Sequence, residues 1–185
     1  MLAVQTVSAV YSEGLFIVPA QNEADSLYQD GYGTRKVKPL ILEPCEALYL
    51  VEKERLTVIT EKDRKPHSFQ QLLDNELKRD TSIWIRYIVY RDIRGRGFVA
   101  KSSKDTSVSF VVYERGDYLK KQPSYDIYTV YEGMPETIGH LDELLKTVKD
   151  SGRSLKLAVV DRRGEIIYYG LDRLDFKALG SDLIE

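Results

Sequence analysis

The sequence predicts a mixed α/β (α+β) protein with two parts, a small mixed N-terminal domain over residues 1–78 and a C-terminal α/β domain over residues 79–185. Two observations support this class. Apolar residues recur at the spacing of amphipathic helices in several separate stretches. Between them lie short runs rich in Val, Tyr and Phe, which are typical of strands, and such runs dominate the second half of the chain.

The composition is that of a globular protein. Of 185 residues, 43% are hydrophobic and 30% charged, which is enough to build a core in one large domain or two small ones. No apolar run approaches the roughly 18 to 20 residues of a membrane span, so we expect no membrane contact. Glu13 and Gly14 interrupt an N-terminus without basic residues, which we interpret as mature protein rather than a signal peptide. The single Cys45 excludes an internal disulfide and indicates a reducing compartment, so we expect a cytoplasmic protein.

The charge balance excludes one kind of nucleic-acid binder. The chain has 27 basic and 29 acidic residues and a formal net charge of −2. Proteins that hold nucleic acid over their whole surface are usually basic. We therefore expect any such contact to come from a local patch or from a partner chain.

In the N-terminal half, turn and capping residues mark the ends of the elements. Pro44 suits the first turn of a helix, Ser68 suits an N-cap, and Gly31 suits a helix end. The predicted elements are a strand at residues 15–20, a helix at 22–31, a helix at 44–54, a strand at 56–60 and a helix from residue 68.

The C-terminal half begins with a helix in which Trp84, Ile88 and Ile93 recur at helical spacing, before Gly95 and Gly97 stop it. Strands follow at residues 98–103, 107–115 and 126–133. A helix is then predicted over residues 136–152, with an apolar stripe of Ile138, Leu141, Leu144, Leu145 and Val148. The final pair of strands, 155–161 and 166–171, is joined by a turn at 162–165.

Several familiar catalytic patterns are absent from the sequence. Glu76 and Lys78 form the single Glu-x-Lys pair, but they lie on a predicted amphipathic helix rather than on the adjacent strands of a metal-dependent nuclease. The two histidines, His67 and His140, are far apart, and with one cysteine they form no zinc motif. The chain has no phosphate-binding glycine loop. We therefore expect no metal and no cofactor.

Five stretches, taken in order, resemble the archaeal tRNA-splicing endonuclease family. They are "LYQDGYGT", "LILEPCEALYLVEKERLTV", "YRDIRGRGFVAKSS", "SFVVYERG" and "LKLAVVDRRGEIIYYGL". The resemblance extends over about residues 25–175. It implies a small mixed N-terminal domain and a nuclease-like C-terminal domain of the tRNA-intron endonuclease type.

The resemblance implies a reaction without metal. The family cuts precursor tRNA at both bulges of a bulge-helix-bulge, leaving a 2′,3′-cyclic phosphate and a 5′-hydroxyl. A tyrosine, a histidine and a lysine serve as base, acid and transition-state stabiliser. Internal attack by the 2′-hydroxyl needs such a set, because a proton must leave the nucleophile, another must reach the leaving oxygen, and charge builds up on the phosphate.

Two of these three positions differ in this chain. Tyr113, in "FVVYERG", matches the family tyrosine. The histidine position falls on Pro123, Ser124 or Tyr125, and none of these side chains is an acid near neutral pH.

The family lysine position falls on Arg153 or Ser154, and Lys156 is two residues out of register with Ser154. The resemblance therefore implies a structural, non-catalytic subunit. Its expected partners are a catalytic tRNA-splicing endonuclease subunit, in an (αβ)2 heterotetramer, and precursor tRNA.

The resemblance also implies an interface between subunits. The family pairs its C-terminal strand edge to edge between subunits and docks an acidic loop into an opposite subunit. The matching residues are Asp161, Glu165, Ile166, Ile167, Tyr168 and Tyr169. Arg162 and Arg163 dilute the charge of that loop.

The family clamps a bulge base between two arginines. Arg173 matches one of them, while the second position falls near Lys146 or Thr147, so the pair is incomplete.

Two other functions remain open at this point. One is an active endonuclease subunit with a shifted triad around Tyr113, formed with Lys156 and an acid such as His140. The other is a binding or scaffold protein on the same fold, because a fold alone does not prove a function.

Overall fold

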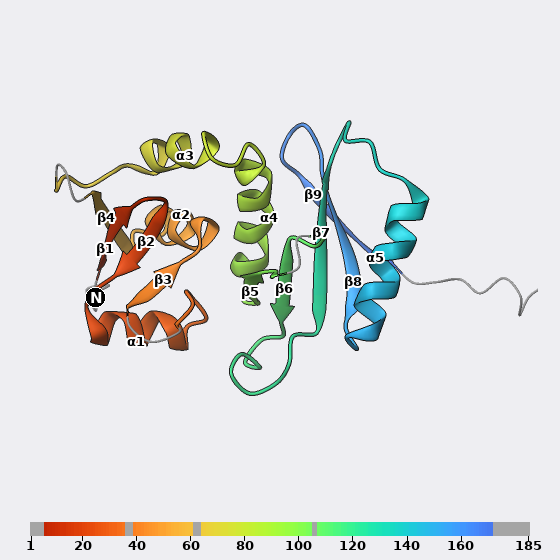
Figure 1. Cartoon of the computed structure of the whole chain (residues 1–185), viewed down its shortest axis with the longest axis horizontal. Coiled ribbons are helices and arrows are strands. Elements are labelled where there is room, and N and C mark those ends of the chain that lie inside the picture. The colour runs from red at the N-terminus through yellow and green to blue at the C-terminus, as the bar shows by residue number, and fades with distance from the viewer. Residues whose placement is uncertain (1–5, 36–38, 61–63, 105–106, 172–185) are drawn as a thin grey trace, which may run out of the picture.

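A computed structural model describes residues 6–35, 39–60, 64–104 and 107–171. The elements in chain order are β1 (Val7–Ser12), β2 (Leu15–Val18), α1 (Gln21–Gln29), β3 (Leu40–Leu42), α2 (Pro44–Glu52), β4 (Leu56–Thr60), α3 (Phe69–Leu77), α4 (Ile83–Gly95), β5 (Val99–Ser102), β6 (Phe110–Tyr113), β7 (Tyr125–Tyr131), α5 (Ile138–Asp150), β8 (Ser154–Val160) and β9 (Ile166–Leu171). Figure 1 shows two sheets side by side with α4 between them.

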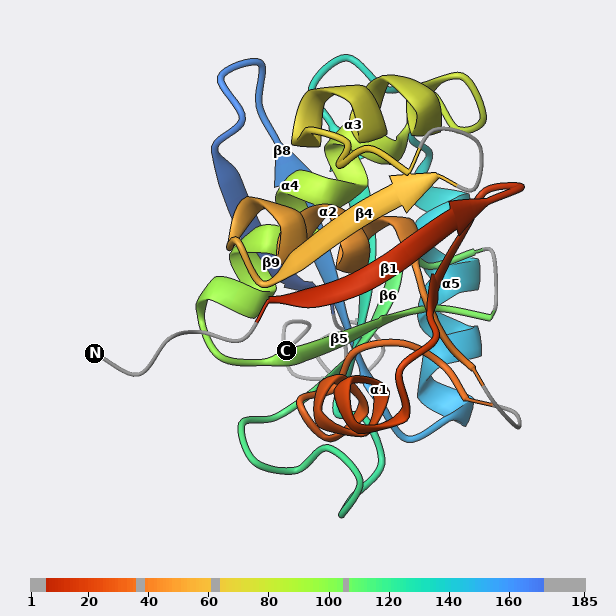
Figure 2. The same ribbon diagram turned by 90° about the vertical axis from the view of Figure 1, so that its left-hand side faces the viewer.

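The N-terminal half is a four-stranded mixed sheet in the order β3-β2-β1-β4. β1 pairs with β4 in parallel (Figure 2). The β1–β2 and β2–β3 pairs are antiparallel. Helix α2 begins at Pro44 as predicted, with the backbone N–H and side chain of Glu46 closing a capping box with Glu43. Ser68 is the predicted N-cap of α3, and its hydroxyl accepts from the backbone N–H of Gln71.

The C-terminal half is a five-stranded mixed sheet in the order β5-β6-β7-β8-β9. β7 and β8 are parallel, so they need a long crossover connection, and α5 forms it. Helix α4 covers one face of this sheet and α5 covers the other (Figure 1). The α/β (α+β) class is confirmed, with two mixed sheets. The division of the chain at residue 78 remains a prediction.

Four details differ from the sequence prediction. β1 and β3 were not predicted, because β1 is rich in small residues and β3 has only three residues directly before α2. Ile138 was placed on the buried stripe of α5 but is 87% exposed, since it is the first residue of the helix and extends beyond the sheet. Trp84, the second residue of α4, is 39% exposed, whereas the first residue, Ile83, is 2% exposed. By contrast, α4 ends at Gly95 and is followed by Gly97 at φ 87°, in agreement with the predicted stop.

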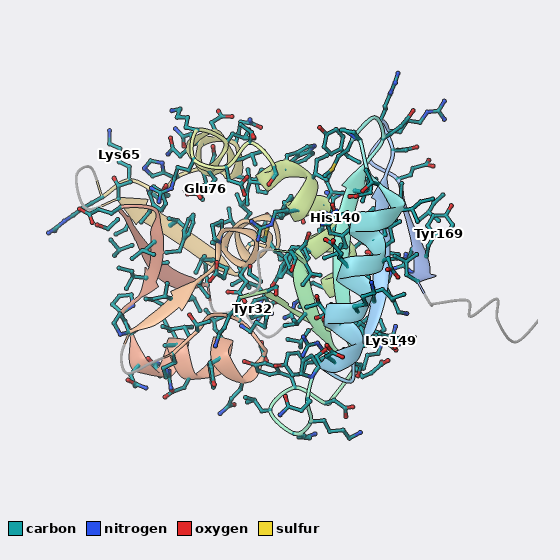
Figure 3. The ribbon with its side chains drawn as sticks, turned by 45° about the vertical axis from the view of Figure 1, so that its right-hand side comes forward. Tyr32, Lys65, Glu76, His140, Lys149 and Tyr169 are labelled. Carbon is teal, nitrogen blue, oxygen red and sulfur yellow. The ribbon has the colours of Figure 1, made fainter. Side chains whose placement is uncertain are left out.

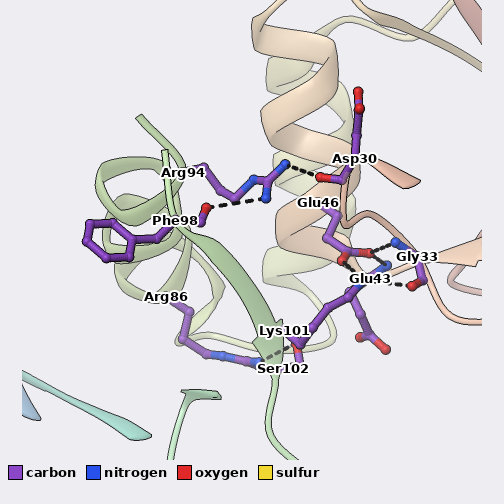
Figure 4. A network of polar contacts seen from close by, with 9 residues as sticks. All are labelled: Asp30, Gly33, Glu43, Glu46, Arg86, Arg94, Phe98, Lys101 and Ser102. Carbon is purple, nitrogen blue, oxygen red and sulfur yellow. Dashed lines mark hydrogen bonds and ion pairs between the residues drawn. The ribbon is translucent and has the colours of Figure 1, made fainter. Parts of the chain in front are cut away.

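Polar contacts join the two halves around Glu46, which is 1% exposed (Figure 4). One carboxylate oxygen accepts from the Lys101 ammonium at 2.8 Å, and the other accepts from the backbone N–H groups of Gly33 at 2.8 Å and Glu43 at 2.9 Å. The same ammonium donates to the Gly33 carbonyl at 2.7 Å. The Arg94 guanidinium lies 4.1 Å from the Tyr32 ring centroid, which adds a second link between the halves.

Candidate functional site

Tyr113, the last residue of β6, lies in an aromatic cluster. Its ring contacts Tyr118 edge to face, with 5.2 Å between centroids, and Tyr118 in turn contacts Tyr28 of α1 at 6.4 Å. Burial, together with the neighbouring phenols, raises the pKa of Tyr118 to about 12. The surroundings of Tyr113 are therefore packing contacts between the loop after β6 and the N-terminal half.

Ser124 and Tyr125 occupy the place of the family histidine. The backbone of Ser124 links β6 and β8, since its N–H donates to Val112 at 2.9 Å and its carbonyl accepts from Ser154 at 3.1 Å. The Tyr125 hydroxyl donates to the Glu114 carboxylate, and this hydrogen bond is the main cause of a raised pKa for Tyr125. A phenol with a raised pKa holds its proton, so Tyr125 is no substitute for an imidazole.

The side chain of Arg153 is bound to a buried carboxylate, that of Asp126. Its Nε atom donates to both oxygens of Asp126, at 3.0 and 2.9 Å, and Asp126 is 1% exposed. Removing this guanidinium would take a charged partner away from a buried carboxylate, so Arg153 stabilises the sheet where β7 and β8 meet.

Strand pairing brings these positions together but divides their side chains between two faces of the sheet. Tyr125 lies opposite Val112 on one side and opposite Ser154 on the other. Directly paired residues share a face and successive residues alternate, so Tyr125 and Ser154 face α4 together with Val112. Tyr113 follows Val112 and points to the other face, and Arg153 binds Asp126 on that other face.

Lys156 lies on the same face as Ser154 and Tyr125. Its ammonium lies 4.1 Å from the ring centroid of Tyr125. The sheet therefore separates Lys156 from Tyr113, so a shifted triad of Tyr113, Lys156 and His140 does not converge on one point.

His140 lies in the first turn of α5 (Figure 3). This helix covers the sheet face opposite the one that Lys156 shares with Tyr125. Its Nδ1 atom is 2.7 Å from a Glu136 oxygen, and the Tyr128 hydroxyl donates to the other oxygen of that carboxylate. Burial acts to raise the pKa of Glu136, but the hydrogen bonds from Tyr128 and His140 outweigh it and lower that pKa. These contacts hold the N-terminus of α5 against the sheet.

The turn between β8 and β9 contains the two predicted acidic residues in different roles. Asp161 Oδ1 accepts from the backbone N–H groups of Arg163 and Glu165, each at 2.8 Å. This carboxylate therefore shapes its own turn. The Glu165 side chain is exposed, as is Arg162, which pairs loosely with Glu132 at 3.4 Å.

In β9, alternate side chains face opposite ways. Ile166 and Tyr168 pack toward α4, where the Tyr168 hydroxyl donates to Asp92 at 2.9 Å and burial raises the pKa of Tyr168. Ile167 and Tyr169 are 58% and 51% exposed, and Tyr169 lies at the outer margin of the C-terminal half (Figure 3). In the described part of the chain β9 pairs with β8 alone, so it presents an open edge beside exposed apolar side chains.

Arg173 lies outside the described residues. Among those that are described, no group of three or more His, Cys, Asp or Glu side chains is arranged to hold a metal ion. Over the same residues no helix is both long enough and apolar enough to cross a membrane.

Sequence reasoning missed Asp126 and Glu114, the carboxylates that bind the Arg153 guanidinium and the Tyr125 hydroxyl. A charged residue between Tyr125 and Ile127 of an apolar strand was the available signal for Asp126.

Comparisons with known proteins match most of the chain. Residues 7–73 match the family described as tRNA intron endonuclease, N-terminal domain, and residues 83–168 match tRNA intron endonuclease, catalytic C-terminal domain. A tRNA-splicing endonuclease of Pyrococcus horikoshii is 31% identical over 157 residues, covering 82% of this chain and 87% of the relative. A tRNA-splicing endonuclease of Methanococcus vannielii is 28% identical over 170 residues, covering 92% and 96%. A similar protein of Thermococcus onnurineus is 28% identical over 137 residues, covering 74% and 78%.

Proposed function

This chain belongs to the tRNA intron endonuclease family, and we propose that within it the chain is a structural, non-catalytic subunit. It assembles with a catalytic tRNA-splicing endonuclease subunit into an (αβ)2 heterotetramer in the cytoplasm. The complex cleaves precursor tRNA at bulge-helix-bulge introns and leaves 2′,3′-cyclic phosphate and 5′-hydroxyl ends. The role of this chain is to support assembly and to position the catalytic subunit.

The observation that best supports a non-catalytic role is the state of the three family positions. Cleavage needs a base, an acid and a cation directed at one phosphate. Here Tyr113 points to one face of the sheet and Tyr125 to the other, and the Arg153 guanidinium binds Asp126. No imidazole is near Tyr125 among the described residues, because His140 lies at the N-terminus of α5 with Glu136.

The open edge of β9 supports a role in assembly. A strand edge with unpaired backbone groups can add a strand from another chain, and adjacent apolar side chains then become buried. Ile167 and Tyr169 are the side chains placed for this role. Asp161 is occupied by its turn, so in this proposal Glu165 makes the acidic contact with the opposite subunit.

A mixing experiment tests the proposal. This chain is expressed alone and together with its catalytic paralogue, and each sample is assayed with a bulge-helix-bulge RNA in EDTA. We expect cleavage in the mixture, none by this chain alone, and a solution mass of four chains for the mixture. The ends of the RNA are then mapped to establish the product chemistry.

Each other outcome would overturn the proposal in a different way. Cleavage by the isolated chain would show an active subunit whose catalytic set is not Tyr113, Lys156 and His140. A mixture in which the two chains remain separate would favour a binding or scaffold protein without a role in splicing.

A further inference from the structure

A pocket of about 220 Å³ lies where the end of α4 meets the sheet. Its walls are mostly apolar and aromatic and include Ile93, Phe98, Val112 and Ile127. Tyr125 and Lys156 line it from β7 and β8. The pocket thus combines apolar walls with a lysine, on the sheet face that Tyr113 does not reach.

Each of three aromatic rings at this pocket has a cation near its face. The Lys156 ammonium is 4.1 Å from the Tyr125 centroid, the Arg115 guanidinium is 5.2 Å from that of Phe98, and the Arg96 guanidinium is 5.7 Å from that of Tyr168. These side chains come from the segment between α4 and β5, the residues after β6, and strands β7 to β9.

The charged side chains at the pocket differ in whether they have an ion-pair or hydrogen-bond partner. Asp92 accepts from Arg96 at 2.8 Å and from Tyr168, and Glu114 accepts from Tyr125. Within the described ranges Lys156 has no carboxylate partner, and its ammonium lies against the Tyr125 ring. Of the two cations that line the pocket, Arg96 is paired with Asp92, so Lys156 is the one that an incoming anion meets without first breaking an ion pair.

We propose that this pocket binds one unpaired nucleotide of an RNA strand, with the base among Phe98 and its apolar neighbours and the phosphate on Lys156. Single-stranded nucleic acids bind where aromatic side chains offer stacking surfaces and cations neutralise the backbone. The proposal rests on the proposed function, because that function brings a bulged RNA to the complex. In this proposal a chain that lacks the catalytic residues still binds the RNA substrate directly.

The choice of ligand follows from the walls of the pocket. An inorganic anion would gain from Lys156 but would leave the apolar walls exposed to water, and an apolar ligand would leave the ammonium unused. A nucleotide satisfies both, because its base has a flat apolar face and its phosphate is an anion.

Photo-crosslinking and equilibrium binding test the proposal on the full chain. The probe is a fluorescein-labelled bulge-helix-bulge RNA with 4-thiouridine in one bulge, and the control RNA is fully paired and of the same length. We expect crosslinks in peptides that contain Phe98 or Tyr125. We also expect Lys156→Ala to weaken binding of the bulged RNA about tenfold and to reduce its salt slope by about one.

Matched variants separate a local effect from a general loss of positive charge. Lys156→Arg keeps the charge and should restore binding, while Lys78→Ala removes an exposed lysine on the N-terminal half and should leave binding unchanged. Crosslinks confined to other peptides, or equal binding by Lys156→Ala and Lys78→Ala, would overturn the proposal. If uridine monophosphate displaced the RNA at a concentration close to that of the RNA, the proposal would also be overturned, in favour of a free-nucleotide site.

The same variants distinguish this proposal from the function on which it rests. Lys156→Ala should still assemble with the catalytic subunit. Assembly and cleavage without any dependence on Lys156 would refute the nucleotide pocket alone. Conversely, binding of bulged RNA that depends on Lys156, in a chain that does not assemble, would refute the structural-subunit role alone.

Discussion

Replacing Lys101 by Met tests whether the contact with Glu46 holds the two halves together. The Lys101 side chain is 13% exposed and that of Glu46 is 1% exposed, with 2.8 Å between ammonium and carboxylate. Removing one partner of a buried ion pair costs about 3–5 kcal/mol, because the other charge is left without compensation. We expect about 3 kcal/mol for Lys101→Met, at the lower end, since the backbone N–H groups of Gly33 and Glu43 still bind Glu46.

Urea denaturation measures this loss as a lower unfolding midpoint at an unchanged slope. Lys53→Met is the matched control, because its ammonium is 4.0 Å from Glu52 and its side chain is 50% exposed, so its loss should cost under about 1 kcal/mol. A Lys101→Met/Glu46→Gln double variant should recover part of the loss, because the amide oxygen still accepts from the Gly33 and Glu43 N–H groups while the buried charge is gone. Equal costs for Lys101→Met and Lys53→Met would refute the reasoning.

Three further predictions concern the site, the β9 edge and pH. Tyr113→Phe should leave cleavage by the mixed complex unchanged, because the ring packing is kept, and a large loss of rate would show a catalytic role for this hydroxyl. Ile167→Asp should weaken assembly with the catalytic subunit about tenfold or more, whereas Leu119→Asp, at the same 58% exposure but in the loop after β6, should not, as sedimentation can measure. Burial acts to raise the pKa of Asp80, but hydrogen bonds from Ser82 and the nearby Arg86 lower it overall. A carboxyl with a lowered folded-state pKa stabilises the fold above its usual pKa and loses that effect as pH falls through the lowered value. Asp80→Asn should therefore destabilise at pH 7, and its cost should shrink as pH falls below the usual value of 3.8. A pH-independent difference between the unfolding curves would contradict this.

Local sequence features predicted most helices and strands. Pro44 and Ser68 begin helices as expected, because a missing N–H and a hydroxyl acceptor suit those positions regardless of the rest of the fold. β3 was missed because its pairing with β2 stabilises three residues that have no local pattern of their own. The residues of the candidate site were located in the sequence, but the faces on which they lie depend on the register of β6, β7 and β8.

Long-range polar pairs lay beyond sequence reasoning for a related reason. Glu46 and Lys101 are 55 residues apart, and neither has a neighbour in sequence that predicts the other. Arg153 matches a family position in the sequence, but its contact with Asp126 depends on the parallel pairing of β7 with β8. Such pairs require the fold before they can be recognised.

One hydrophobic core runs through both halves, with Leu50 of α2, Tyr90 of α4 and Ile127 of β7 in the same buried cluster. Helix α4 would lose its cover on one side if the N-terminal half were deleted, and the exposed apolar surface would favour aggregation. Under the proposed function, in which β9 makes the assembly contacts, the chain therefore cannot be shortened to β9 and its sheet. The N-terminal half would persist through evolution as a folding requirement, even where natural selection acts on the C-terminal half alone.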